Sequence, residues 1–321
     1  MLKIVDDNRL IYKVCSLYYE DAMNQQEICN YLGISRASVS RMLQRGRELG
    51  IVNIEVVNPV RFSYGELEKT IERAYGLKEV IIVESSSLDE KKEYISSLYE
   101  EAALFLHEIF RKDEHIGVTM GYNLHNISKT KMSFEKKEGY TFVPIVGGMN
   151  RIRAGEEDIQ SNEIAKEFAD MFGGTYTQFL SPAVFSKKRV MKSFLKEESV
   201  NYIFDEFKKV STLVMGIGTP DRGASTLLRA GYITEEEFSD LIDQGMMGDI
   251  ALQFFDKNGD TTKFQEFNER VAGMSSNMMK QIENRIAIGG GEGKAKAIKG
   301  AIKGGFVNML ITNVSCAENL L

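Results

Sequence analysis

Arginine side chains gather in one short stretch near the start of the chain. Arg36, Arg41, Arg45 and Arg47 fall within twelve residues that contain no acidic side chain. Guanidinium groups hydrogen-bond in pairs to guanine edges and to phosphate oxygens. The stretch therefore carries chemistry suited to a nucleic acid. Taken alone, it would also fit the solvated basic face of an ordinary amphipathic helix.

Helical spacing would put these arginines on the outward side of a single helix. Val39, Met42 and Leu43 recur at i, i+3 and i+4, which gives one apolar stripe for packing. The opposite face carries guanidinium, hydroxyl, methyl and carboxamide groups, all of which can reach base edges or phosphates in a major groove. The residues that we expect to contact DNA, one of them on the preceding helix, are Gln25, Ser35, Arg36, Ala37, Ser38, Ser40, Arg41, Gln44 and Arg45.

Capping residues delimit this helix and a shorter one before it. Ser35 supplies the hydroxyl wanted at an N-cap, and Gly50 can take the left-handed conformation that ends a helix. Upstream, Asn24 and Glu27 have the spacing of a capping box, and Gly33 separates the two helices. Helix, glycine turn and a second helix with a basic face form the helix-turn-helix arrangement, whose second helix enters the major groove.

Further elements complete a small N-terminal domain, which we place at residues 1–58. Apolar residues at helical spacing predict a first helix from about Asp7 to Asp21. The β-branched run Ile51–Val57 predicts a strand that would form a wing. A helix in residues 59–76 would then serve as a linker or a dimer contact.

Four short motifs follow one another between Gln25 and Val57: Gln-x-Glu-Ile, Leu-Gly-Ile-Ser-Arg, Val-Ser-Arg-Met-Leu and Gly-Ile-Val-x-Ile-x-Val. Together they resemble the DNA-binding domain of the SorC family of bacterial sugar-responsive transcription regulators. The resemblance implies a winged helix-turn-helix that binds operator DNA.

Composition limits the class of protein. With 321 residues, 43% hydrophobic and 27% charged, the chain suits two globular domains of unequal size. A net charge of −6 argues against a protein that coats nucleic acid without sequence preference. Cys15, Cys29 and Cys316 are odd in number and widely spaced, which suggests neither a disulfide framework nor a zinc site. We expect a cytoplasmic protein with no export signal, no membrane span, no metal and no cofactor.

The pattern changes from Glu79 onward to short apolar runs that alternate with longer helices. These runs are Val80–Val83, Ile116–Thr119, Phe142–Val146, Leu213–Gly218, Arg285–Ile288 and Val307–Thr312. Continuous apolar strands alternating with helices are typical of a parallel sheet that is covered on both faces. We therefore predict a doubly wound, mainly parallel α/β domain at residues 77–321, following the winged helix-turn-helix.

Glycine follows several of these strands. The runs are Gly117–Asn123, Gly147–Gly148, Gly216–Thr219 and Gly289–Lys294. Ligands of open α/β sheets bind outside the carboxyl ends of the strands, and glycine lets backbone amides approach an anion closely. Lys294 adds a counter-charge. The runs match neither a dinucleotide fingerprint nor a Walker A sequence, and each alone could be a tight turn; together they predict a phosphate site.

The resemblance to the SorC family extends through this region. Its landmarks are Gly117–Gly121, Val146–Gly148, Val214–Gly218, Arg229–Ile233, Gly248–Ile250, Phe254–Asp260 and Gly290–Ile298. They resemble an effector domain that is related in fold to sugar-phosphate isomerases and deaminases. The resemblance implies a phosphorylated sugar, with its phosphate near Lys294 and its hydroxyls near Asp249. The residues expected to bind it are Thr119, Gly121, Asn123, Gly147, Gly148, Gly218, Asp249, Gly290, Gly291 and Lys294.

One position departs from the family pattern. Some members have a lysine immediately before the paired glycines, where it can form an imine with an aldehyde sugar, and here that position is Val146. We therefore do not expect covalent capture of the effector at this position.

Two functions are compatible with these residues. The first is a non-enzymatic transcription regulator of carbohydrate metabolism, self-associated as a dimer or tetramer, whose operator binding is controlled by a phosphorylated sugar or polyol. The alternative is a sugar-phosphate isomerase or deaminase with a helical appendage, for which Asp249 is the one candidate base. The intact basic helix favours the regulator.

Other conspicuous residues suggest no chemistry. His107, His115 and His125 lack metal-ligand spacing with the cysteines. Asp256–Asp260 predicts a hairpin turn. The charge runs Asp89–Glu93 and Lys187–Arg189 are expected to be solvated helix faces.

Overall fold

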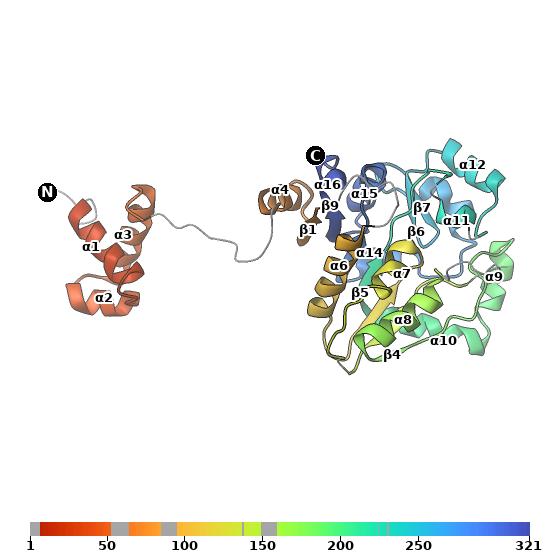
Figure 1. Cartoon of the computed structure of the whole chain (residues 1–321), viewed down its shortest axis with the longest axis horizontal. Helices are drawn as coiled ribbons and strands as arrows, with labels where there is room; N and C mark the ends of the chain where they lie inside the picture. The colour runs from red at the N-terminus through yellow and green to blue at the C-terminus, as the bar shows by residue number, and fades with distance from the viewer. Residues whose placement is uncertain are drawn as a thin grey trace. The chain divides into compact units, whose positions relative to one another are not determined.

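The computed structural model describes residues 7–52, 64–84, 95–136, 138–148, 159–223, 225–229 and 231–321. The chain divides into two compact units, Met1–Arg61 and Phe62–Leu321, each described below by itself (Figure 1). Residues 53–57 of the expected wing and the charge run Asp89–Glu93 lie outside the described residues. No helix in the described ranges is long and apolar enough to cross a membrane.

The N-terminal unit contains three helices around one small core. They are α1 (Asn8–Tyr19), α2 (Gln25–Leu32) and α3 (Arg36–Glu48). Ile11, Val14, Ile28, Val39 and Met42 are fully buried between them. These residues recur at helical spacing in the sequence, so the predicted apolar stripes do form the core.

Local hydrogen bonds hold the turn between α2 and α3. Asn24 Oδ1 accepts from the amide of Glu27 at 3.0 Å, and Glu27 Oε2 accepts from the amide of Asn24 at 2.8 Å, which completes the predicted capping box. Gly33 takes the left-handed conformation with φ 64°. Ser35 then caps α3 by accepting from the amide of Ser38. The predicted helix-turn-helix is confirmed.

The second unit is built on a seven-stranded sheet that is parallel throughout, with strand order β1-β9-β8-β5-β2-β3-β4. Its strands are β1 (Glu79–Val83), β2 (His115–Val118), β3 (Thr141–Pro144), β4 (Thr175–Tyr176), β5 (Val210–Met215), β8 (Asn284–Ile288) and β9 (Met309–Asn313). A separate antiparallel pair joins β6 (Gly248–Ile250) and β7 (Gln253–Phe255).

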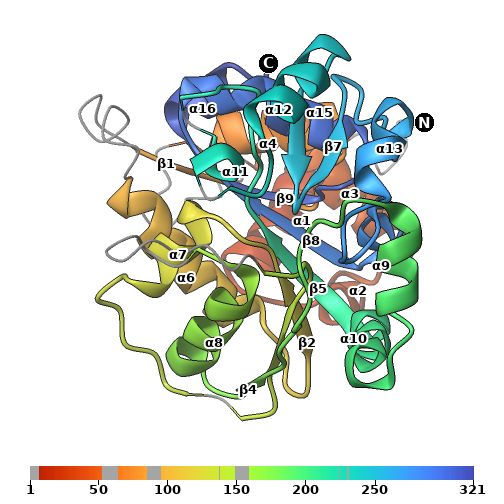
Figure 2. The same cartoon turned by 90° about the vertical axis from the view of Figure 1, so that its right-hand side faces the viewer.

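Helices cover both faces of the sheet (Figure 2). One face packs on α6 (Ser96–Ile109), α7 (Tyr122–Ser128) and α8 (Ser161–Phe172). The other packs on α4 (Gly65–Tyr75), α10 (Glu198–Lys209), α12 (Glu235–Asp243), α14 (Ser276–Gln281), α15 (Ala295–Lys303) and α16 (Val314–Glu318). Shorter helices are α9 (Lys188–Phe194), α11 (Thr226–Arg229), α13 (Gln265–Asn268), η2 (Thr262–Phe264) and η3 (Glu292–Lys294).

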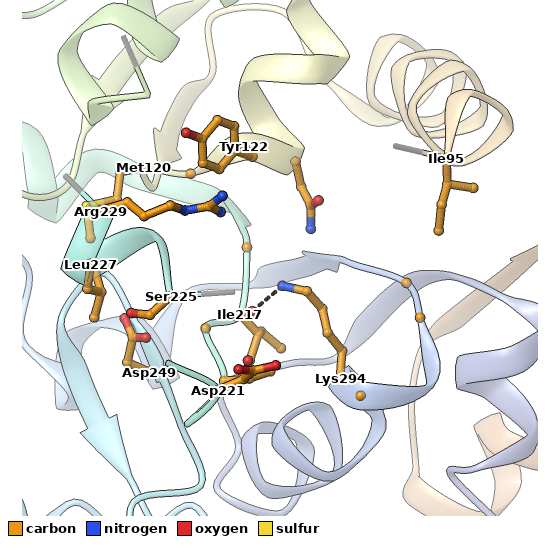
Figure 3. A pocket seen from close by; sticks show the side chains of 18 of the residues that line it. Ile95, Met120, Tyr122, Ile217, Asp221, Ser225, Leu227, Arg229, Asp249 and Lys294 are labelled. Carbon is orange, nitrogen blue, oxygen red and sulfur yellow. Dashed lines mark hydrogen bonds between the residues drawn. The ribbon is translucent and has the colours of Figure 1, made fainter. Parts of the chain in front are cut away.

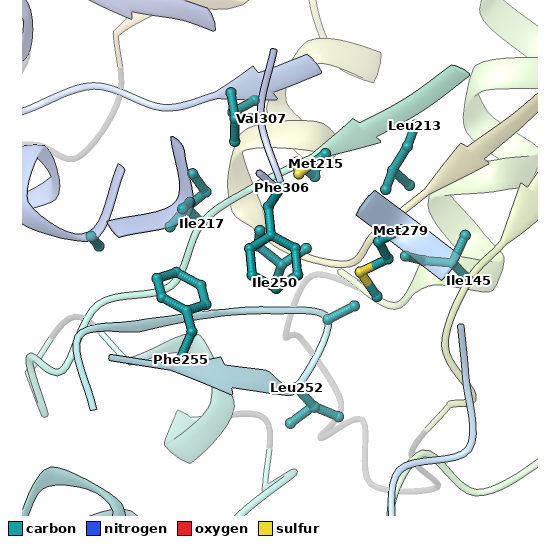
Figure 4. Close-up of a cluster of buried hydrophobic side chains, with 14 of the residues drawn as sticks. Ile145, Leu213, Met215, Ile217, Ile250, Leu252, Phe255, Met279, Phe306 and Val307 are labelled. Carbon is teal, nitrogen blue, oxygen red and sulfur yellow. The ribbon is translucent and has the colours of Figure 1, made fainter. Parts of the chain in front are cut away.

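Alternate residues of the central strands enter the two cores. Leu213 and Met215 of β5 belong to the larger core, while Val214 between them belongs to the other (Figure 4). Because both faces are buried, most strand residues are apolar, which explains the apolar runs of the sequence. The predicted doubly wound fold is confirmed.

Helix α4 is attached to the edge of this sheet. Glu68 Oε1 accepts a hydrogen bond from the amide of Ile82 at 2.9 Å, and Glu72 Oε1 accepts one from the amide of Val80 at 3.0 Å. Both amides belong to the edge strand β1. Ile71 is fully buried, and the Tyr75 hydroxyl donates to the carbonyl of Leu320. The helix expected in residues 59–76 therefore begins at Gly65 among the described residues and packs as part of the second unit.

The structure differs from the sequence analysis at two places. The strands β6 and β7 were not predicted; they are joined by Ala251 and Leu252, both in the left-handed region at φ 47° and 66°. The predicted hairpin turn at Asp256–Asp260 is a turn, in which the Asp256 carboxylate accepts hydrogen bonds from the amides of Asn258 and Asp260. The chain then continues into η2 instead of a second strand, so it is not a hairpin.

Gly46 marks the closest approach of α3 to α1. A Cβ added at Gly46 would overlap with Sγ of Cys15, which is buried. We expect Gly46→Ala to destabilise the N-terminal unit by about 1–2 kcal/mol, because overpacking outweighs the helix propensity that alanine adds. Hydrogen exchange of the α1 and α3 amides would measure the loss. Gly46→Ala combined with Cys15→Ala should restore protection; faster exchange that persists in the double variant would contradict this account.

Candidate functional site

The polar face of α3 is open to solvent. Of the residues predicted to contact DNA, the exposed ones are Ser35, Arg36, Ala37, Ser40, Arg41, Gln44 and Arg45, while Gln25 and Ser38 are partly buried. Among the residues that the structure describes, the Arg41 side chain makes one hydrogen bond, from its Nε to the carbonyl of Ala37 at 3.2 Å within its own helix. The seven exposed residues thus lie on α3 or at its N-cap, whereas Gln25 belongs to α2.

An acidic residue that the sequence analysis did not consider modifies the end of this face. Glu48 accepts from Arg45 at 2.9 Å and from Gln44 Nε2 at 3.1 Å, and the hydrogen bond from Arg45 lowers the pKa of Glu48. Part of the positive charge at the C-terminal end of α3 is therefore neutralised. Arg36 and Arg41, nearer the N-terminal end, form no ion pair with any carboxylate in the described part of the chain.

The second unit contains a cavity of about 290 Å³ beside the carboxyl ends of β2, β5 and β8. From β2 the chain runs outward through β3 and β4, and it then returns to β5 on the other side of β2. The loops after β2 and β5 therefore diverge, which leaves room for a ligand at this switch point. Seven of the ten predicted effector residues line the cavity: Gly121, Asn123, Gly218, Asp249, Gly290, Gly291 and Lys294.

The loop after β8 brings backbone and a positive charge to the cavity. Gly291 donates its amide to Asn313 Oδ1 at 2.8 Å, and a Cβ at Gly290 would come within 2.8 Å of the same oxygen. Glycine is needed because the loop passes directly over the end of β9. Lys294 follows at the start of α15, and its Nζ donates to the carbonyl of Ile217 at 2.8 Å (Figure 3).

Asp249 forms the opposite wall. Its backbone pairs with Gly218 through the amide of Gly218 at 2.9 Å, and a side chain at Gly218 would overlap with the Asp249 carboxylate. Burial raises the pKa of Asp249 to about 6, while a hydrogen bond from the amide of Leu252 and the charge of Lys294 act in the opposite direction. The carboxyl group can therefore change its protonation state near neutral pH.

The loop after β2 supplies the third wall. Gly121 has φ 126°, which places the following residues at the start of α7. Asn123 Nδ2 donates to the carbonyl of Ile288 at 3.0 Å, and its Oδ1 accepts from the Tyr99 hydroxyl at 3.2 Å. These bonds fix the carboxamide of Asn123 against the cavity.

Three predicted residues do not line the cavity. Thr119 is fully buried, and its hydroxyl accepts from the amide of Gly216 at 3.1 Å, so it ties the end of β2 to β5. Gly147 and Gly148 donate their amides to Ala272 and Ser181. A Cβ at Gly147 would lie 2.5 Å from the carbonyl oxygen of Ser181. Close backbone packing requires glycine at position 147, whereas a Cβ at Gly148 would meet the carboxamide oxygen of Gln160. Contact of Thr119, Gly147 and Gly148 with the effector stays a prediction.

Other cavity residues were missed by the sequence analysis. Arg229 stacks its guanidinium over the ring of Tyr122 at 4.9 Å, across the cavity from Lys294 (Figure 3). Asp221 and Ser225 precede α11, whose last residue is Arg229. The sequence analysis named Arg229–Ile233 as a landmark of the family, but it did not assign Arg229 to the effector, because neither periodicity nor spacing shows that this side chain turns inward.

Comparisons with known proteins agree with this arrangement of two units. A sequence family described as "Putative sugar-binding domain" matches residues 62–321, and one described as "Bacterial regulatory proteins, crp family" matches residues 22–51. The chain is 29% identical to the sorbitol operon regulator of Klebsiella pneumoniae, and the match covers 98% of each protein. It is also 29% identical to the deoxyribonucleoside regulator of Bacillus subtilis (strain 168), again with 98% of each protein covered.

A solved structure covers both units. The crystal structure of the full-length sorbitol operon regulator SorC from Klebsiella pneumoniae matches with a TM-score of 0.70 at 29% identity, covering 98% of this chain and 99% of that one. A regulator from Listeria monocytogenes matches 81% of this chain with a TM-score of 0.71 at 24% identity, which supports the fold of the second unit.

The buried Asp249 should make stability depend on pH. The pKa of Asp249 is about 6 in the folded protein, compared with 3.8 for an unburied aspartate. Its ionisation therefore does not lower the free energy of unfolding below pH 3.8, but lowers it by about 3 kcal/mol well above pH 6. Asp249→Asn mimics the protonated form. We expect urea unfolding to show that the stability of this variant relative to wild type rises by about 1 kcal/mol from pH 5 to pH 8. The exposed Asp170→Asn is the control, and a pH-independent difference for Asp249→Asn would contradict the raised pKa.

Proposed function

Because the chain belongs to the SorC family of sugar-binding transcriptional regulators, we propose that a phosphorylated sugar or polyol controls its binding to operator DNA. The protein is a DNA-binding transcription regulator with a sugar-binding domain. The observation that carries the proposal is the cavity in which the glycine loop after β8 and Lys294 face Asp249.

The phosphate is assigned to the Lys294 side of the cavity. The backbone at Gly290, Gly291 and Gly293 carries no side chains that would keep an anion away, and Lys294 supplies the positive charge. The Nζ of Lys294 rests on the carbonyl of Ile217, and a phosphate oxygen would be a stronger acceptor for the same ammonium group. This chemistry favours a phosphate ester over a neutral sugar.

Hydroxyl groups of the effector are assigned to the side formed by Asp249. A carboxylate accepts hydrogen bonds from two neighbouring hydroxyls, and Ser225 and Asn123 add further polar groups along the cavity. Val146, at the position where some family members have a lysine, is fully buried and pairs with Gly273. We therefore propose reversible, non-covalent binding at this site.

DNA recognition is assigned to α3. In a helix-turn-helix the second helix lies in the major groove, where Arg41 and Arg36 would contact bases or phosphates. Operators of such proteins are two-fold repeats, so we propose a dimer or tetramer. The effector controls DNA binding only if it binds the two quaternary states with different affinity. We assign the protein to the cytoplasm, where it would meet its operator.

A catalytic role is the second candidate, and one observation favours it. Asp249 combines burial, a pKa of about 6 and a place in the cavity, which are properties of a general base. Its Oδ2, however, is occupied by the amide of Leu252 at 3.1 Å, where it helps to hold the left-handed turn between β6 and β7. We propose a binding role for Asp249, and turnover of a bound sugar phosphate would overturn it.

Arg41→Ala should weaken binding to the DNA upstream of the protein's own gene by about 10-fold or more, because one base or phosphate contact of a readout helix is lost. The melting temperature should stay unchanged, since Arg41 is exposed and its hydrogen bond within the described residues is to its own helix. Fluorescence anisotropy with labelled DNA measures the effect, with Arg73→Ala of α4 as the matched control. Equal DNA affinity of Arg41→Ala and wild type would refute the assignment of α3.

Lys294→Ala should abolish the rise in melting temperature that phosphorylated sugars cause in the wild type, because the counter-charge of the phosphate is removed. A thermal-shift screen of sugar phosphates, each paired with its unphosphorylated sugar, provides the measurement. Lys303→Ala, an exposed lysine of the same helix outside the cavity, is the control. Equal stabilisation of the wild type by phosphorylated and unphosphorylated sugars would show that the anion site is wrong.

A further inference from the structure

A basic surface lies on α9 and the residues that flank it. We define it by Lys187, Lys188, Arg189, Lys192 and Lys196, five cations in ten residues of a protein whose net charge is −6. Four of these side chains, together with Ser193, surround a shallow hollow. The charges point outward because Met191, Phe194 and Leu195 on the other side of the segment pack against the core.

Most of this surface is not neutralised within the chain. Lys188 forms an ion pair with Glu269 at 2.5 Å. Arg189, Lys192 and Lys196 have no carboxylate within 4.0 Å among the residues that the structure describes. Bringing like charges this close has an electrostatic cost, and an acidic partner would remove it.

An acidic surface lies on α12 of the same unit. We define it by Glu235, Glu236, Asp240 and Asp243, all exposed. The opposite side of α12 is buried through Phe238 and Leu241. Glu235 lies 3.8 Å from Arg222, whereas the other three acids have no basic partner within the described part of the chain.

The helices that carry the two surfaces lie at the same end of the second unit. Helices α9 and α12 are both at the right-hand end of Figure 1, the side that faces the viewer in Figure 2. Large apolar side chains are also exposed on α9 and on the elements next to it in the sequence: Val190 on the helix itself is 47% exposed, Leu180 in the segment between β4 and α9 74%, and Tyr202 on α10 43%. Tyr202 donates to the carbonyl of Gln178, which keeps its ring beside the segment that carries Leu180.

We propose that α9 and α12 form a self-complementary interface through which two copies of this chain associate, the basic surface of each copy meeting the acidic surface of the other. Two-fold symmetry makes every such contact occur twice. The exposed apolar side chains add the water-excluding contact that surface ion pairs alone do not supply.

The acidic surface decides between a second copy and a polyanion. DNA or an anionic membrane would fit α9 but would be repelled by the carboxylates of α12 on the same side. A second copy uses both surfaces at once. The proposal names the interface behind the self-association of the regulator and needs neither the effector nor DNA.

Charge reversal tests the proposal on the full-length protein by sedimentation velocity without DNA or effector. Arg189→Glu with Lys192→Glu and Lys196→Glu turns the net charge of the basic surface from +5 to −1, which leaves two acidic surfaces on each copy. Glu236→Lys with Asp240→Lys and Asp243→Lys turns the net charge of the acidic surface from −4 to +2, which leaves two basic ones. Each triple variant should associate about 10-fold more weakly than wild type or lose one step of assembly, because like charges then face each other. Lys208→Glu with Lys209→Glu on α10, outside both surfaces, should associate like wild type, and thermal melts check that all variants fold.

Mixing the two reversed variants gives the decisive result. A copy with two acidic surfaces and a copy with two basic surfaces are complementary, so the mixture should recover wild-type association although neither variant associates alone. A mixture that stays dissociated, or reversed variants that associate like wild type, would overturn the proposal. Weaker DNA binding of the triple variant at Arg189, Lys192 and Lys196 at unchanged association would also overturn it, by showing that α9 contacts DNA. Because association is measured without ligands, a failure of effector or operator binding is detected separately.

Discussion

The hydrogen bond from Lys294 to the carbonyl of Ile217 joins the loops that follow β8 and β5, and the proposed effector site depends on it. It holds the ammonium group of Lys294 at the point where the order of the strands reverses. The cavity wall there is formed by the glycine backbone of the loop after β8. The parallel sheet makes this possible, because it brings the carboxyl ends of strands that are distant in sequence to one edge. Two further hydrogen bonds hold the same loops. Thr119 connects the end of β2 to the end of β5, and Asn313 connects the loop after β8 to the end of β9.

A regulator must also pass information from this cavity to the DNA. The effector can change operator affinity only through states that it binds unequally, and the elements available for this begin with α4. Glu68 and Glu72 fasten α4 to the backbone of β1, and β1 pairs with β9, whose last residue Asn313 holds Gly291 at the cavity. This chain of contacts links the start of the second unit to the effector site. Whether it carries the coupling is decided by double-mutant measurements and not by proximity.

Much of the fold could be predicted because local and global preferences agree. The capping box at Asn24, the left-handed Gly33 and the apolar stripe of α3 define the helix-turn-helix, and parallel strands that are buried on both faces are mostly apolar. The antiparallel pair β6 and β7 was not predicted because its strands are only three residues long. Its turn uses Ala251 and Leu252, and neither residue type indicates a left-handed backbone in a sequence. Glycine gave an ambiguous prediction of the cavity residues. Gly290 and Gly291 line the cavity, whereas position 147 requires glycine because the backbone of Ser181 lies against it. Arg229 was missed because its inward direction depends on tertiary contact with Tyr122.

The central claim is that occupancy of the Lys294 cavity and binding of α3 to DNA are linked. Linkage requires that the effector change DNA affinity by the same factor by which DNA changes effector affinity. The most direct measurement is therefore a pair of titrations with a sugar phosphate identified by its binding to the protein: DNA affinity with and without it, and its affinity with and without DNA from upstream of the gene. The account predicts equal factors different from one. A sugar phosphate that occupies the cavity and leaves both affinities unchanged would contradict it.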